Sequence, residues 1–227
     1  MDDGFERINT GVHGVDALIE GGYPFPSVIL VAGPAGTGKT TFTQQFLFAG
    51  ADTDEIGLYI TTLSEPTQWV MHYMSNIRCL KKKHIGKGVK FCDIGQMLRS
   101  TTPEKLLTHI DEEIARTMAQ RVVIDPITVI KEFFGNEYRP FLFDLVNHLK
   151  NWQAVSLLTG EVEPDRTYPS EVAYASDGVV LLTYEEKEGT RRKYLEVLKM
   201  RGTDHRTGKQ SFVITRNEGF KVLNETF

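Results

Sequence analysis

Cysteine is scarce in this sequence, with two residues among 227. Cys79 and Cys92 are too far apart for a C-x-x-C motif, so we expect neither a disulfide framework nor a zinc site, and reduced thiols in a cytoplasmic protein fit better. The chain also lacks an apolar run as long as a membrane span. Its first residues are acidic and include no apolar stretch, so we expect no signal peptide and no membrane attachment.

An excess of positive charge is missing as well. The 26 Lys and Arg residues are outnumbered by 30 Asp and Glu residues, which gives a formal net charge of −4. Such a chain has no general attraction to nucleic acid, although a local patch could exist. The lysine-rich segment 81–90 could touch nucleic acid, but a solvated loop is the favoured interpretation. The six histidines show neither an H-E-x-x-H motif nor a paired spacing, so they give no support for a metal site.

The most informative segment is GPAGTGKT at residues 33–40, which matches the P-loop pattern G-x-x-x-x-G-K-[ST]. Its glycines allow successive backbone N–H groups to point at a polyphosphate. Lys39 can reach the β- and γ-phosphates, and the Thr40 hydroxyl can bind Mg²⁺. The residues predicted to contact the nucleotide here are Gly33, Pro34, Ala35, Gly36, Thr37, Gly38, Lys39, Thr40 and Thr41.

The context of this segment also fits. Residues 28–32 form an apolar run typical of a buried strand, and residues 41–48 are typical of a helix. A second apolar run, residues 121–124, ends in Asp125, an acid placed to hold Mg²⁺. Ligands of open α/β sheets lie at the carboxyl ends of strands, so Gly33 and Asp125 are expected at the same edge.

Apolar strands alternate with amphipathic helices along most of the chain. This alternation predicts an α/β fold with a mostly parallel central sheet and helices on both faces. The last third predicts strands joined by short turns, which we expect to extend the sheet in antiparallel fashion within one domain spanning residues 1–227. The predicted strands cover residues 57–62, 89–92, 121–125, 154–159, 178–184, 192–200 and 212–215.

Helices are predicted over residues 15–20, over 65–76 and in the segment that follows Thr102-Pro103. In the last of these, one apolar face is expected to carry Leu106, Leu107, Ile110, Ile114 and Met118. A further helix is predicted around residues 141–149.

Glu65 follows the predicted strand 57–62. A carboxylate there can polarise the water that attacks a γ-phosphate. The alternative is that Glu65 only favours the start of a helix, where negative charge is stabilising.

A polar cluster follows the predicted strand 192–200. Lys199 and Arg201 are two residues apart and should project to the same face, and Thr203 and His205 share that face if the extended geometry continues past Gly202. These residue types suit phosphate and ribose contact. A charged edge hairpin that resists aggregation would look the same, and local physics does not decide between the two.

Taken together, GPAGTGKT, RVVID, TTLSEP, SDGVVLL and above all LKMRGTDH make the chain resemble a KaiC-like ATPase of the RecA superfamily from about Arg7 onward. The resemblance implies a RecA-type fold that binds ATP with Mg²⁺ and hydrolyses it to ADP and phosphate. It also implies a homo-oligomeric ring, usually a hexamer, in which Lys199 and Arg201 reach the nucleotide held by a neighbouring subunit. Thr203 and His205 would contact nucleotide in the same interface. A regulatory or signalling role would follow, with an unknown protein partner.

The chain departs from the family pattern in two places. KaiC proteins commonly carry two adjacent glutamates where Ser64 and Glu65 stand here, which predicts slow hydrolysis. This chain has one ATPase domain where KaiC has two, and autokinase and clock functions are not carried over. Two other functions stay open: a RecA- or RadA-like recombination ATPase on single-stranded DNA, and a nucleotide-gated assembly module with little turnover.

Overall fold

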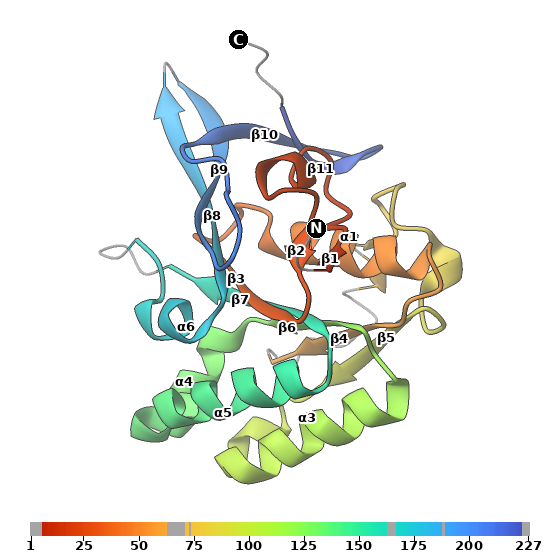
Figure 1. Ribbon diagram of the computed structural model, residues 1–227, viewed down its shortest axis with the longest axis vertical. Coiled ribbons are helices and arrows are strands. Elements are labelled where there is room, and N and C mark those ends of the chain that lie inside the picture. The colour runs from red at the N-terminus through yellow and green to blue at the C-terminus, as the bar shows by residue number, and fades with distance from the viewer. Residues whose placement is uncertain (1–5, 63–70, 73, 163–166, 188, 224–227) are drawn as a thin grey trace, which may run out of the picture.

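The computed structural model of the chain describes residues 6–62, 71–72, 74–162, 167–187 and 189–223. A nine-stranded sheet crosses this part of the protein (Figure 1). In spatial order its strands are β11 (Gly219–Val222), β10 (Gln210–Thr215), β9 (Thr190–Met200), β8 (Gly178–Lys187), β3 (Ser27–Gly33), β7 (Val155–Glu161), β6 (Arg121–Asp125), β4 (Gly57–Thr61) and β5 (Val89–Asp93). The strands from β8 to β5 pair in parallel, and β9, β10 and β11 extend the sheet in antiparallel fashion. This confirms the predicted RecA-type α/β architecture.

Helices cover both faces of the sheet. Figure 1 shows α1 (Lys39–Ala51) on one side, together with the small pair β1 (Arg7–Ile8) and β2 (Tyr23–Pro24). The other α-helices of the described residues lie on the opposite side; they are α3 (Pro103–Thr117), α4 (Ile130–Phe134), α5 (Tyr138–Asn151) and α6 (Ser170–Ala175). Short 3₁₀ helices occupy Asp16–Leu18, Lys82–His84, Met97–Arg99, Ile127–Val129 and Gly135–Glu137. No helix in these described ranges is long and apolar enough to cross a membrane.

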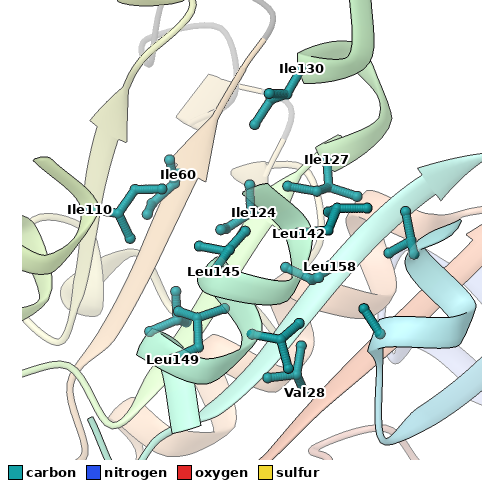
Figure 2. Packing of buried hydrophobic residues seen from close by; sticks show 14 of the residues in the cluster. Val28, Ile60, Ile110, Ile124, Ile127, Ile130, Leu142, Leu145, Leu149 and Leu158 are labelled. Carbon is teal, nitrogen blue, oxygen red and sulfur yellow. The ribbon is translucent and has the colours of Figure 1, made fainter. Parts of the chain in front are cut away.

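Each face of the sheet has its own apolar core, because side chains alternate along a strand. Along β3, Val28 and Leu30 pack on the side of α5, whereas Ile29 and Val31 pack on the side of α1. Figure 2 shows the first of these cores, in which Leu142, Leu145 and Leu149 of α5 point at the strands. Full burial of one such side chain contributes roughly 1.5–3 kcal/mol. The two-sided burial explains why β3 reads as an unbroken apolar run in the sequence.

The start of α3 follows the prediction. The Thr102 hydroxyl accepts a 3.4 Å hydrogen bond from the backbone N–H of Lys105, and Pro103 occupies the first turn. The predicted apolar face of this helix is wrong at its last residue, Met118. Its φ of 55° ends the helix in a left-handed conformation, and its side chain is 74% exposed.

Other local predictions need revision. The helix expected over residues 15–20 is a single 3₁₀ turn at Asp16–Leu18, since Gly21 and Gly22, with φ of 100° and 146°, turn the chain away. The strand β11 was not predicted, and neither were the short elements β1, β2, α4 and α6. Most of the helix expected over residues 65–76 lies outside the described residues.

Candidate nucleotide-binding site

The segment 33–40 joins β3 to α1, as the sequence predicts, and two of its glycines are required by geometry. A Cβ on Gly33 would lie 2.4 Å from the carbonyl oxygen of Leu182. Gly38 precedes α1 with a φ of +104°, and a Cβ there would lie 2.3 Å from Cδ1 of Ile214. The loop therefore runs against β8 and β10, and it leaves the first N–H groups of a 13-residue helix at its end. This is the arrangement that favours a bound phosphate group.

Lys39 is the buried cation of the loop, with 7% of its surface exposed. Its ammonium donates hydrogen bonds of 2.8 Å and 3.1 Å to the carbonyl oxygens of Gly33 and Pro34. A carboxylate oxygen of Glu161, at the end of β7, lies 3.7 Å away and is the nearest counter-charge among the described residues. Because the Glu161 side chain is 59% exposed, a phosphate group could replace it as the partner of Lys39 without stripping a buried acid of its solvent.

Asp125 ends β6 inside the sheet, 7% exposed, and is held by three hydroxyl groups. Its Oδ2 accepts hydrogen bonds of 2.9 Å from Thr40 and 2.7 Å from Tyr59, and its Oδ1 accepts one from Thr159. All three donors are neutral, and among the described residues no cation contacts the buried carboxylate. A buried carboxylate whose described partners are all neutral favours a metal ion, and the Thr40 and Asp125 oxygens suit Mg²⁺.

A second lysine lies at the loop. The ammonium of Lys193, from β9, donates a 3.0 Å hydrogen bond to the carbonyl oxygen of Gly36. Burial, with a smaller effect from Arg191, lowers the pKa of Lys193. A pocket beside it is lined by Arg191, Arg192, Phe212 and Ile214 among others. The sequence contains no signal for this lysine, because only the pairing of β8 with β9 carries it to the loop.

Lys199 and Arg201 lie elsewhere in the protomer. In the sheet, Lys199 is opposite Val179, which in turn is opposite Leu30. Leu30 lies about 10 Å along β3 from Gly33, where the loop starts. Because β9 is antiparallel to β8, the chain moves away from the loop after Lys199, and Arg201 is further from it still. Neither side chain is therefore at the P-loop of its own chain.

Both cations instead contact the other end of the sheet. The Lys199 ammonium donates to the carbonyl oxygens of Ala173 and Ser176, at 3.1 Å and 2.5 Å. Burial, with a smaller effect from Arg201, lowers the pKa of Lys199. The Arg201 guanidinium is 60% exposed and donates a 3.2 Å bond to Asp177.

Asp177 connects this region to the core of the protein. One carboxylate oxygen accepts from Lys150 as well as Arg201, and the other accepts from the backbone N–H of Val28 at the start of β3. At 7% exposure, Asp177 is buried and fully partnered.

Thr203 and His205 do not continue the strand. β9 ends at Met200, and a turn with φ of +66° at Gly202 follows, so the condition for a shared face is not met. The Thr203 hydroxyl accepts a 3.1 Å bond from Arg7, and the His205 ring contacts the Thr203 carbonyl oxygen at 3.5 Å.

The predicted general base, Glu65, lies outside the described residues, as does Ser64. The lysine-rich segment is partly engaged within the chain: Lys81 forms an ion pair with Asp52, and Lys90 donates to the carbonyl oxygen of Gly86.

Comparisons with known proteins agree with this geometry. The family described as "ATPase: KaiC" matches residues 8–226. A UPF0273 protein of Methanopyrus kandleri is 31% identical over 96% of this chain and 92% of its own length. The circadian clock oscillator protein KaiC of Rippkaea orientalis is 32% identical over 97% of this chain, which spans 44% of that longer protein. A crystal structure of a KaiC-like protein from Pyrococcus horikoshii is similar, with a TM-score of 0.86 and 29% identity, covering 97% of this chain and 100% of that one.

Proposed function

This chain belongs to the KaiC ATPase family, and on that premise we propose that it binds ATP with Mg²⁺ and hydrolyses it to ADP and phosphate. The observation that carries the proposal is the 2.9 Å hydrogen bond between Thr40 and Asp125 beside the P-loop. It brings together two oxygen ligands that are 85 residues apart in the chain, at the place where a β- and γ-phosphate would lie. Mg²⁺ held there would neutralise charge on the phosphate oxygens.

In this proposal Lys39 binds the phosphates by exchanging partners. Its ammonium leaves the carbonyl oxygens of Gly33 and Pro34 for the stronger charge of a phosphate oxygen. The N–H groups at the start of α1 add to the attraction for anions. Lys193, which donates to the carbonyl oxygen of Gly36, supplies a further positive charge at the loop.

Glu65 orients or activates the attacking water in this proposal. The assignment rests on residue type and on position after β4, whose last residue is Thr61. The neighbouring Ser64 replaces the second acid of the family pattern, so turnover is expected to be slow.

In this proposal a neighbouring subunit supplies further positive charge to the nucleotide. We propose that the chain acts as one domain in a homo-oligomeric ring, a hexamer by resemblance, located in the cytoplasm and serving a regulatory or signalling role. Lys199 and Arg201 would then face the nucleotide of the next subunit and neutralise charge in the transition state. Their distance from their own P-loop and the exposure of Arg201 support this arrangement.

Calorimetric titration with ATP, with and without Mg²⁺, tests the metal assignment. Mg²⁺ should strengthen ATP binding by the wild-type protein and should have little effect on the Asp125→Asn variant. Asp93→Asn is the matched control, because Asp93 ends β5 at the same register level, is exposed, and is separated from β6 by β4. Equal Mg²⁺ dependence in wild type and Asp125→Asn would refute the assignment.

A second function is favoured by Ser64 alone: a nucleotide-gated assembly module that binds ATP with little hydrolysis. The two functions share the binding site and differ in turnover. Phosphate release by the purified oligomer, compared with the Lys39→Ala variant as a blank, separates them. Release at the blank's level together with tight ATP binding would favour the assembly module.

A further inference from the structure

A cysteine, a histidine and a glutamate meet between the edge strand β5 and the helix α3. They are Cys92, His109 and Glu113, and each is half-buried. The thiol sulfur, one ring nitrogen and one carboxylate oxygen all lie within 4.8 Å of one another. From the sequence alone no zinc site is expected here, because Cys92 and His109 are 17 residues apart and share no motif.

The backbone places the three side chains on a common side. His109 and Glu113 are four residues apart in α3, so they are neighbours on one face of the helix. Cys92 pairs with Ile60 in the sheet, and both pack in the core that α3 covers. Two separate elements, a strand and a helix, thus present three ligand types that zinc commonly takes in proteins.

The spacing also fits a tetrahedral ion. The Cys92 sulfur and the His109 Nε2 are 3.7 Å apart. Ligands at 2.3 Å and 2.0–2.1 Å from a tetrahedral Zn²⁺ are separated by about 3.6 Å. These two side chains therefore need almost no movement to share one ion, and the carboxylate of Glu113 is near enough to follow.

We propose that Cys92, His109 and Glu113 bind a thiophilic divalent cation of the Zn²⁺ type, with water as the fourth ligand. As the sulfur–metal bond forms, the thiol proton leaves to solvent. Glu113 gives up one of its two contacts with Arg116, whose side chain is 62% exposed and whose ion pair is therefore weak. The ion would fasten α3 to the edge of the sheet.

This site is separate from the nucleotide. Cys92 is level with Ile60 of β4 and Ile124 of β6, so about 10 Å and the thickness of the sheet lie between it and the Asp125 carboxylate.

Titration with Co²⁺ tests the proposal on the full chain, under reducing conditions and without nucleotide. Wild-type protein should develop the thiolate-to-cobalt charge-transfer band and the visible bands of tetrahedral cobalt at one ion per chain, and added Zn²⁺ should abolish them. The Cys92→Ser variant should lose the charge-transfer band. Cys79→Ser, which removes the other thiol, should keep it.

A second variant guards against misfolding of the first. His109→Asn should retain the thiolate band at higher metal concentration, with affinity lowered about 100-fold or more. His148→Asn, on α5, is its control and should bind like the wild type, and circular dichroism should show all four variants folded. Three results would overturn the proposal: no charge-transfer band in folded wild type, an equal band in Cys92→Ser, or unchanged affinity in His109→Asn.

Discussion

Mixed oligomers made from two inactive variants test whether Arg201 acts across a subunit interface. Arg201→Ala keeps its own P-loop and should bind ATP, whereas Lys39→Ala keeps Arg201 and should not. An arginine supplied to phosphoryl transfer contributes about 10³–10⁵ in rate, so each variant alone should fall to about one thousandth of wild-type turnover or less. If Arg201 acts in trans, an interface between an Arg201→Ala P-loop and a Lys39→Ala neighbour has every part it needs.

The expected recovery follows from the composition of the ring. In a random equal mixture, about one interface in four pairs an intact P-loop with an intact Arg201 from the neighbour. Turnover should therefore rise to about a quarter of the wild-type value, more than a hundredfold above either variant alone. If Arg201 acts on its own P-loop, no subunit of the mixture is complete and nothing is recovered.

The structure indicates that both variants should fold. Arg201 is 60% exposed, and after its removal Asp177 keeps Lys150 and the N–H of Val28 as partners. The Lys39 ammonium donates its hydrogen bonds to two carbonyl oxygens of the loop, which a substitution leaves at the mouth of the nucleotide site rather than in an apolar core. Phosphate release is the assay, circular dichroism checks folding, and mass spectrometry checks that rings are mixed. Lys39→Ala mixed with the double variant is the control. Absence of recovery in mixed rings would refute the trans role of Arg201.

Two further predictions address chemistry and stability. Glu65→Gln should bind ATP and accumulate as a loaded oligomer, with turnover lowered about 10²–10⁴-fold, as for loss of a general base; turnover within about threefold of wild type would show that the base lies elsewhere. Hydrogen bonds from Lys81, then from His84, hold the pKa of Asp52 below its ordinary value of 3.8. A lowered folded-state pKa stabilises the protein above the ordinary pKa and not below the folded one. Wild type should therefore be more resistant to urea than Asp52→Asn at neutral pH, and this small advantage should vanish at pH values well below 3.8; an advantage that is independent of pH would contradict the sign.

The P-loop and Asp125 could be predicted because their signals are local. A buried strand followed by a glycine-rich turn and a helix can be recognised within 21 residues of sequence, and the acid that ends β6 can be recognised the same way. The parallel sheet follows from the alternation of strands and helices. Both predictions depend on neighbours in the chain rather than on distant contacts.

The parts that could not be predicted depend on strand order and on local backbone angles. Tyr59 and Thr159 hold Asp125 only because β4 and β7 flank β6, and Lys193 reaches Gly36 only because β9 pairs with β8. Periodicity placed Met118 on the apolar face of α3, but a left-handed residue reversed its direction. Strand pairings between distant segments and single left-handed residues leave little trace in one sequence.

Because Arg201 already forms an ion pair with Asp177 in its own chain, contact with a neighbouring subunit would replace one ion pair by another. In the ring that we propose, Arg201 must leave this carboxylate before it can turn to a neighbour's phosphate. Lys150 then remains as the charged partner of Asp177, so the buried carboxylate keeps an ion pair after Arg201 leaves. The free energy of engagement is the difference between two ion pairs, which is smaller than either one. Such an interface can form and dissociate within each nucleotide cycle. A substitution at Lys150 would change the equilibrium between the two ion pairs of Arg201 without altering any group that touches ATP.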